Sequence, residues 1–380
     1  PWPEGDTPRR AGITSLGVGG TNAHVVLEEA APAPERPRSE GWQLLPVSAR
    51  TPMAAVRAVE RLGDHLADRP ELDLADVAAT LQLGRKAFEQ RRFVVADGVA
   101  DAASALADPG RVIAGTTAER SLSVAFMFAG IGAQQPEMGI GLYRREPRYR
   151  EELDRALTSL HERVGLDLRP YLFPADDEAA RAEAEAALRR PSIALPALTV
   201  TQLALAALWR SWGIEPSALI GHSLGEYAAA HVAGVFSLTD TLAIVAERGR
   251  LLEAIAPGSM VAVSLSEREL LPRLGDALDL AVINAPELCV VAGPPEAVSD
   301  LERRLVADDI DVRPIHLDAA AHCRLLDPVL DRFASFLARI AMAAPTLPLV
   351  SNLTGDWADP QRIATPDYWV EHLRRTVRFS

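Results

Sequence analysis

The sequence GHSLG at residues 221–225 contains the residue types of a serine nucleophile on a sharp turn. An apolar run that is typical of a strand precedes it, and small residues that favour a helix follow it. Glycines on both sides of Ser223 would let the strand and the helix pack closely, with the hydroxyl group at the carboxyl end of the strand. The alternative is that Ser223 only caps the helix, but the strand before it and the helix after it favour the nucleophile.

A serine nucleophile needs a general base, and His322 is the best placed of the eight histidines. It follows the last strand of an expected small subdomain, where the chain must return to the larger one, so its loop can reach the serine. Its position alone leaves an ordinary structural role equally open. We interpret the neighbouring Cys323 as a small core residue, because adjacent side chains point in different directions.

Two further features of the sequence could take part in the chemistry. Arg248 lies 25 residues after Ser223 in an expected helix at 240–255, among apolar neighbours. A surface role is the more common one for such an arginine, but an inward-facing guanidinium could hold a carboxylate with two parallel hydrogen bonds. The loop at 130–132 reads Gly-Ile-Gly without a following lysine, so it favours a backbone N–H near a reacting carbonyl over a phosphate-binding loop.

Strands and helices alternate along the larger part of the chain, which predicts a wound, largely parallel sheet in an α/β fold. From about 258 to 317 the expected order is strand, helix, strand, strand, helix, strand, which is the ferredoxin-like pattern βαββαβ. Ser266 and Glu269 predict a capping box at its first helix. Between residue 111 and this region, helices are expected at 147–164, 175–190, 194–212, 225–234 and 240–255.

The first third of the chain divides into shorter pieces. Residues 1–30 contain one expected strand, at 23–27, which cannot form a domain alone. Residues 31–42 have the proline-rich, charged composition of a linker. Residues 43–110 are expected to form a small α/β unit, in which Ser48 would begin the first helix.

Composition excludes several classes of protein. A chain of 380 residues has room for two or three folding units. Its net charge of −13 argues against nucleic acid as the main partner. Its two cysteines, Cys289 and Cys323, form no CxxC or metal-ligand spacing, so we expect no disulfide and no metal. No signal peptide is recognised, and the apolar run at 193–209 is short for a membrane span, which predicts a cytoplasmic protein without a membrane partner.

Four segments, in this order and spacing, resemble the malonyl-CoA:acyl-carrier-protein transacylase family, and specifically the acyltransferase domain of a type I polyketide synthase. These segments are FAGIGAQ, GHSLGEYAAAHVAGVFSL, RGRLL and AAAHCRLLDP. Residues 1–30 resemble the end of a ketosynthase, residues 43–110 the ketosynthase–acyltransferase linker domain, and residues 111–380 the acyltransferase. The resemblance implies a large α/β-hydrolase-like subdomain with the ferredoxin-like subdomain inserted into it. It also implies a truncated C-terminal end, because the family continues beyond TVRFS.

The resemblance implies a role for each site residue and a set of partners. An acyl group, most simply malonyl, would pass from coenzyme A to the serine and then to the phosphopantetheine thiol of an acyl carrier protein. No bound cofactor or metal is implied, and the neighbouring ketosynthase would be a second protein partner. The implied roles are nucleophile for Ser223, general base for His322, binding of the extender carboxylate for Arg248, oxyanion hole for the backbone N–H groups of Ile131 and Leu224, and contact with the substrate for His222.

The sequence departs from the family pattern where substrate size is set. Glutamine usually stands in place of Ile131, although only the backbone N–H of this residue is needed. The motif that ends at the histidine, with Ala319 and Ala321 as expected substrate contacts, reads AAAH. It matches neither the malonyl pattern, HAFH, nor the methylmalonyl pattern, YASH. Leu224 favours malonyl, while the small alanines leave a bulkier extender open.

Two other functions share part of this pattern. An acyl hydrolase or serine thioesterase would also use a GxSxG serine and a histidine. Arg248 argues against it, because an enzyme for uncharged acyl groups has no reason to bury an arginine. A non-catalytic docking platform within a synthase would not need Ser223, His322 and Arg248 together.

Overall fold

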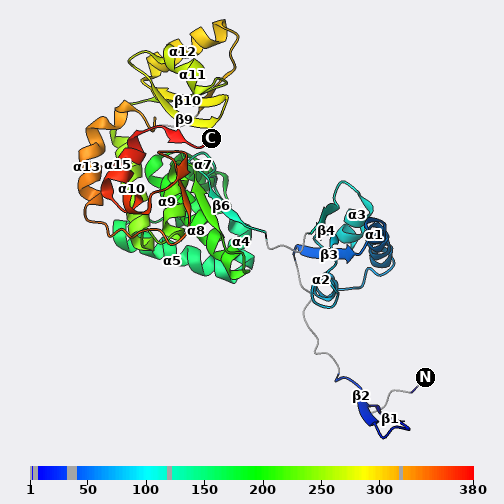
Figure 1. The fold of residues 1–380 in the computed structure, drawn as a ribbon. Coiled ribbons are helices and arrows are strands. Elements are labelled where there is room, and N and C mark those ends of the chain that lie inside the picture. Colours follow the sequence, from blue (N-terminus) through cyan, green and yellow to red (C-terminus); the bar gives the residue numbers. More distant parts are fainter. Residues whose placement is uncertain (1, 3–6, 32–40, 118–121, 316–319) are drawn as a thin grey trace. The chain divides into compact units, whose positions relative to one another are not determined.

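The computed structural model describes residues 2, 7–31, 41–117, 122–315 and 320–380. The chain forms two compact units, residues 1–121 and 122–380 (Figure 1). Each unit is described separately below.

The N-terminal segment folds as a hairpin of two antiparallel strands, β1 (Arg10–Leu16) and β2 (Asn22–Glu28). Sequence analysis expected the second strand only. Nearly all residues of both strands are exposed, including apolar ones such as Ile13 and Val26. The hairpin therefore contributes no buried core of its own.

The rest of the first unit is a small α/β fold with an antiparallel sheet in the order β3-β4-β5. Its core contains Leu45, Val59 and Val94. The expectation that Ser48 begins a helix was wrong: Ser48 lies in β3, and the helix starts after Thr51, whose side chain accepts a hydrogen bond from the N–H of Ala54. Proline at the first helical position explains this start. The elements are β3 (Gln43–Ala49), α1 (Pro52–Ala67), α2 (Leu74–Leu83), β4 (Gln90–Ala96), α3 (Val99–Ala107) and β5 (Ile113–Thr116).

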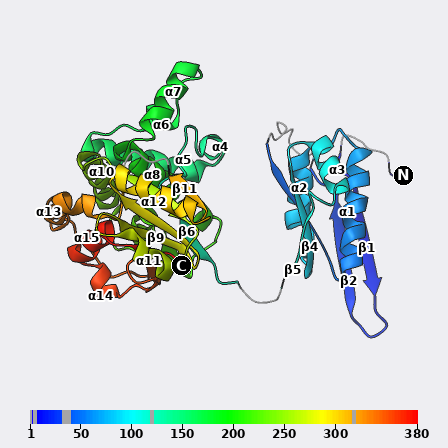
Figure 2. The same ribbon diagram turned by 90° about the horizontal axis from the view of Figure 1, so that it is seen from above.

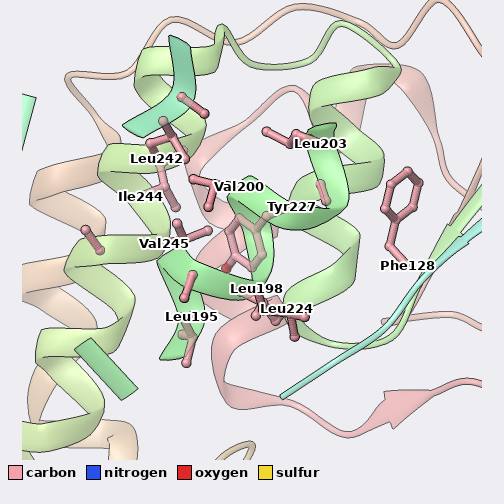
Figure 3. Packing of buried hydrophobic residues seen from close by; sticks show 14 of the residues in the cluster. Phe128, Leu195, Leu198, Val200, Leu203, Leu224, Tyr227, Leu242, Ile244 and Val245 are labelled. Atoms are coloured by element: carbon pink, nitrogen blue, oxygen red, sulfur yellow. The ribbon is translucent and has the colours of Figure 1, made fainter. Parts of the chain in front are cut away.

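The second unit is built on a four-stranded sheet in the order β13-β12-β7-β6, in which β6, β7 and β12 are parallel. Its strands are β6 (Ala125–Phe128), β7 (Ala218–Gly221), β12 (Leu349–Ser351) and β13 (Asp356–Trp357). The helices of its main core are α5 (Pro147–Val164), α8 (Pro191–Ser211), α9 (Leu224–Val232) and α10 (Leu238–Ala254). Figure 3 shows Tyr227 of α9 packed between Leu198 and Val200 of α8 and Val245 of α10.

Helix α8 is the one helix among the described residues that is long and apolar enough to cross a membrane. Of its most apolar window, 72% is buried inside the fold, where the helix packs against α5 and α10. Burial of this extent is what a central core helix requires.

Residues 259–315 form the expected order of strands and helices, and their sheet has the strand order β11-β8-β10-β9-β14. All neighbours are antiparallel except β14, which pairs in parallel with β9. Helices α11 and α12 cover one face of this sheet (Figures 1 and 2). The predicted capping box of Ser266 and Glu269 is confirmed. The elements are β8 (Ser259–Val263), α11 (Glu267–Leu274), β9 (Asp279–Ala285), β10 (Leu288–Gly293), α12 (Pro295–Ala307) and β11 (Val312–Ile315).

The remaining helices lie between β6 and β7 or after residue 320, and the segments after residue 320 connect the two sheets of the second unit. The opposite face of the five-stranded sheet, to which Val377 belongs, packs against Ala320 and Cys323, so the segment that follows β11 shares one core with this sheet. Cys323 is fully buried, as its interpretation as a core residue predicted. The elements are α4 (Ile140–Arg145), α6 (Arg169–Leu172), α7 (Glu178–Ala187), the 3-10 helix η1 (Arg324–Val329), α13 (Leu330–Leu337), α14 (Pro360–Ile363), α15 (Pro366–Arg374) and β14 (Val377–Arg378).

Close packing of α9 on the sheet depends on the absence of a side chain at Gly225. A Cβ atom there would overlap the backbone carbonyl of Phe128 in β6. We expect Gly225→Ala to destabilise the protein by about 3 kcal/mol or more, because neither backbone can move without disturbing the core. Thermal unfolding would measure the loss.

Gly141 provides the matched control. It lies within helix α4, and a Cβ atom there would meet none of the described residues within 4 Å. Gly141→Ala should leave the unfolding temperature unchanged or raise it, because alanine favours a helix more than glycine does. Equal stability of the two variants would contradict the packing argument.

Candidate active site

Ser223 lies between the end of β7 and the start of α9, in a backbone conformation that residues other than glycine rarely adopt. Its φ is 51° and its ψ is −106°. Such a conformation is strained, and it persists only where the surrounding structure enforces it. Gly221 and Gly225 allow it, because a Cβ atom at Gly221 would overlap the backbone at the start of α9, and one at Gly225 would overlap the backbone of Phe128 in β6. The turn predicted from the sequence is therefore present, with Ser223 at its tip.

His322 contacts the serine directly. Its Nε2 lies 2.7 Å from Ser223 Oγ, and both side chains are buried. Its Nδ1 lies 3.1 Å from the backbone carbonyl oxygen of Arg375. Because a carbonyl oxygen can only accept, Nδ1 carries the ring proton and Nε2 is left to accept the proton of the serine hydroxyl. The structure thus holds His322 in the tautomer that a general base requires.

Burial keeps the His322 imidazole neutral. It lowers the pKa of His322 well below its usual value, and the positive charge of Arg248 acts in the same direction. The neighbouring histidines, His372 and His222, lower this pKa further. A neutral imidazole is the form that can remove a proton.

Arg248 on α10 points into the same buried space. Its side chain is only 2% exposed, and its Nη2 donates a hydrogen bond of 2.8 Å to Ser223 Oγ. The guanidinium carbon lies 5.2 Å from the centre of the Tyr227 ring. Its Nε and Nη1 atoms have no hydrogen-bond partner in the described part of the chain, and the Glu226 carboxylate attracts its charge without a direct ion pair. A buried, partly unbonded cation is costly, so the site favours a bound anion.

His222 links the serine turn to the five-stranded sheet. Its Nε2 lies 2.8 Å from Oδ1 of Asn284 in β9, and its ring packs 5.0 Å from the ring of Phe379. Its backbone N–H donates to the carbonyl of Phe128 in β6. Burial lowers the pKa of His222, so this imidazole is neutral as well.

The two N–H groups expected in the oxyanion hole lie on the loop after β6 and at the start of α9. Leu224 is the first residue of α9, where helix geometry leaves the N–H without an intrahelical partner. The side chain of Ile131 packs against the main core. Neither N–H donates to a described residue. The N–H of Ser223 itself is occupied, because it donates to Asn352.

The alanine motif before the histidine is only partly described. Ala319 lies outside the described residues. Ala320 is fully buried against the five-stranded sheet. Ala321 is half-buried and contacts both the core beside this sheet and the main core. Ala321 and His322 are neighbours in the chain, so this loop lies beside the serine.

Sequence analysis missed a buried polar cluster behind the serine, formed by Glu226, Ser351, Asn352, Tyr368 and His372. The Tyr368 hydroxyl donates to the Glu226 carboxylate, and His372 Nε2 lies 3.3 Å from that carboxylate. The ring of His372 lies 6.1 Å from the ring of His322. The available signal was the position of Glu226 three residues after Ser223, on the buried face of α9. No element was expected near the other four residues.

Comparison with known families agrees with this geometry. Residues 125–380 match the family described as "Acyl transferase domain", and residues 43–106 match "CurL-like, PKS C-terminal". The first match covers more than half of the chain. The chain therefore belongs to the acyl transferase domain family.

Its relatives are type I polyketide synthases. Polyketide synthase GfsA of Streptomyces halstedii is 40% identical over 391 residues, which cover 99% of this chain and 5% of that synthase. The acyl transferase domain of ZmaA is 36% identical, with a TM-score of 0.83 over 90% of this chain and 79% of that one. The acyl transferase domain of SpnD, solved in complex with 2-(pent-4-yn-1-yl)malonyl, is 39% identical, with a TM-score of 0.80 over 89% of this chain and 80% of that one. The chain thus contains an acyltransferase domain that resembles those of polyketide synthases.

The lowered pKa of His322 predicts the pH dependence of serine acylation. The imidazole stays unprotonated as the pH falls through about 6.5, the ordinary histidine value, so the rate should hold down to a clearly lower pH. Rapid-quench mass spectrometry of the acyl-enzyme from pH 8 to pH 5 would measure it. A rate that halves near the ordinary histidine value would contradict the burial argument.

Stability must be followed in the same pH series. In the unfolded chain His322 regains its ordinary pKa of about 6.5, so below this pH the unfolded state binds more protons than the folded state. Stability contributed by the neutral, buried His322 is therefore present at neutral pH and is lost as the pH falls. Circular dichroism at each pH would show which points still refer to folded protein.

Proposed function

We propose that this chain loads an extender unit, malonyl, from coenzyme A onto the phosphopantetheine thiol of an acyl carrier protein in polyketide biosynthesis. The observation that carries the proposal is the guanidinium of Arg248, buried, without a carboxylate partner among the described residues, and 2.8 Å from Ser223 Oγ. A thioester that places its carbonyl carbon at Ser223 would bring a carboxylate a few ångströms beyond it to Arg248. The carboxylate could then accept two parallel hydrogen bonds from the guanidinium, one of them from a donor that is otherwise unbonded.

Acylation would begin with removal of the serine proton by His322 Nε2. The serine oxygen attacks the thioester carbonyl carbon, and the carbonyl oxygen becomes an oxyanion. The N–H groups of Leu224 and Ile131 would stabilise it, and a donor of this kind typically contributes about 3 kcal/mol. Coenzyme A then leaves as the thiol, with the proton that His322 had taken, and the acyl group remains as an ester of Ser223.

Transfer would use the same groups in reverse. The phosphopantetheine thiol enters where coenzyme A had been, and His322 removes its proton. The thiolate attacks the ester carbonyl, the oxyanion forms in the same place, and Ser223 leaves with the proton from His322. Because His322 is buried and neutral, it is available as the base at the start of each half-reaction.

The choice of malonyl rests on Leu224 and on the carboxylate. The related SpnD domain was solved with a substituted malonyl group, so a larger extender is the competitor to test. We assign Ala319 and Ala321 as substrate contacts, whose small side chains would leave space for a larger acyl group. His222 would bound this space from the opposite side, held by Asn284.

The proposal extends to the organisation of the chain. We assign residues 1–30 to the end of a ketosynthase, 31–42 to a linker, 43–110 to the ketosynthase–acyltransferase linker domain and 111–380 to the acyltransferase. Within the last, we assign 258–317 to a ferredoxin-like subdomain and the remainder to an α/β-hydrolase-like one. The partners would be an acyl carrier protein and the neighbouring ketosynthase of a cytoplasmic synthase; the two buried, free cysteines suit a reducing compartment.

Removal of the guanidinium should change which acyl group the serine accepts. Wild-type protein given equal malonyl-CoA, methylmalonyl-CoA and acetyl-CoA should form one adduct, of malonyl mass, and Ser223→Ala should form none. Arg248→Ala should lose roughly 100-fold or more of its preference for malonyl over acetyl, because charged hydrogen bonds to the carboxylate are lost. Intact-protein mass spectrometry after brief incubation measures all three adducts together.

Arg250 provides the matched control. It lies on the same helix but is exposed, and it bonds to the carbonyl of Val164. Arg250→Ala should keep the wild-type preference. Hydrolysis of every acyl-CoA without a lasting adduct would instead indicate an acyl hydrolase. Absence of both adduct and hydrolysis in folded protein would indicate a docking role.

A further inference from the structure

Asn352 lies at the end of β12, the strand next to β7 in the four-stranded sheet. It directly follows β12, which pairs in parallel with β7, and Ser223 follows β7 after one intervening residue. The carboxyl ends of parallel neighbours meet at the same edge of a sheet. Asn352 therefore contacts the serine turn from the interior of the protein, and only 1% of its surface is exposed.

The side-chain amide of Asn352 spans the strained turn. Its Oδ1 accepts a hydrogen bond of 2.6 Å from the N–H of Ser223, and its Nδ2 donates one of 2.7 Å to the carbonyl of Gly221. An N–H can only donate and a carbonyl can only accept, so these partners determine the orientation of the amide. One side chain thus joins the residue before His222 to the residue after it.

Glu226 holds Asn352 in place. The backbone N–H of Asn352 donates a hydrogen bond of 2.8 Å to Oε2 of Glu226, which is itself fully buried on α9. The Tyr368 hydroxyl bonds to the other oxygen of this carboxylate and to Ser351, and His372 lies 3.3 Å from Oε2. The amide of Asn352 is therefore fixed through its backbone as well as through its side chain.

We propose that Asn352 is a positioning residue for the reaction at Ser223. It keeps the backbone of Ser223 in its strained conformation, so that Oγ stays in line with His322 Nε2. It also occupies the N–H of Ser223, which leaves stabilisation of the oxyanion to the N–H groups of Leu224 and Ile131. This inference rests on the proposed acyl transfer and deepens it.

The role differs from that of an ordinary buried side chain. Loss of the amide frees the turn to relax, while the distant core remains unchanged. A displacement of the serine oxygen by about 1 Å typically lowers a rate by about 100-fold. Binding of the substrate through Arg248 and the coenzyme A moiety does not involve Asn352. The defect should therefore appear in the maximal rate and not in the half-saturating concentration.

The test is rapid-quench mass spectrometry of Ser223 acylation by malonyl-CoA, with the wild-type protein, Asn352→Ala and Asn352→Asp. The alanine removes both hydrogen bonds, and the aspartate replaces the donor to Gly221 by a repelling oxygen. Both variants should reach the full acyl-enzyme amplitude, with a maximal rate about 100-fold lower and an unchanged half-saturating concentration. Thr354→Ala, an exposed position two residues further along, should behave as wild type.

Two outcomes would overturn the inference. One is a wild-type rate in folded Asn352→Ala. The other is a reduced amplitude in which the remaining molecules react at the wild-type rate, because that pattern describes loss of folded protein only. Circular dichroism of each variant identifies the folded fraction.

A fluorophosphonate probe separates this inference from the proposed function. The probe labels an activated serine and needs neither a carboxylate nor coenzyme A. Wild-type protein that accepts the probe but no acyl group would contradict the proposed function, while slower labelling of Asn352→Ala would still support positioning. Normal acylation by the wild type with equal labelling of both proteins would overturn the positioning role alone.

Discussion

The strained backbone of Ser223 is the constraint on which the rest of the site depends. A residue with a side chain adopts φ 51° only when its surroundings hold it there. Two glycines remove the atoms that would clash, and Asn352 joins the two ends of the turn. The start of α9 and the end of β7 are thereby fixed relative to each other. Every further contact of the serine, to His322 and to Arg248, requires this fixed geometry.

The second constraint is electrostatic. Burial lowers the pKa of His322, and the charge of Arg248, itself buried beside Ser223, lowers it further, so that the imidazole stays neutral. The same cation lacks a carboxylate partner within the described residues, which makes the free site complementary to an acidic acyl group. One side chain thus contributes both to the state of the base and, in the proposed function, to the choice of substrate. An enzyme for uncharged acyl groups would gain the first effect only at the cost of an unpaired buried charge.

Sequence reasoning predicted the parts that have strong local patterns. The order of elements from β8 to β11 and the bounds of α5 follow from apolar periodicity, and the serine turn follows from its glycines. Prediction failed after residue 317, where β12 has three residues and β14 has two, too few to show a period. Asn352, directly after β12, could not be found for that reason, and His372 lies in α15, a helix that sequence analysis did not predict. Their contacts depend on the pairing of β12 with β7 and on the packing of α15, neither of which the local sequence encodes.

These unpredicted segments determine how the histidine base is held. The ring proton of His322 is directed to the carbonyl of Arg375, at the end of α15. Directly after it, β14 pairs with β9, and Phe379 packs on the ring of His222. The side chain of His222 is in turn bonded to Asn284 in that same β9. The five-stranded sheet therefore orients both histidines. Its strand β9 contacts His222 through Asn284 and pairs with β14, which follows Arg375. A change at Ala321, which contacts the cores on both sides, would act on the base and, in the proposed function, on substrate space, because both depend on where this sheet lies against the serine turn.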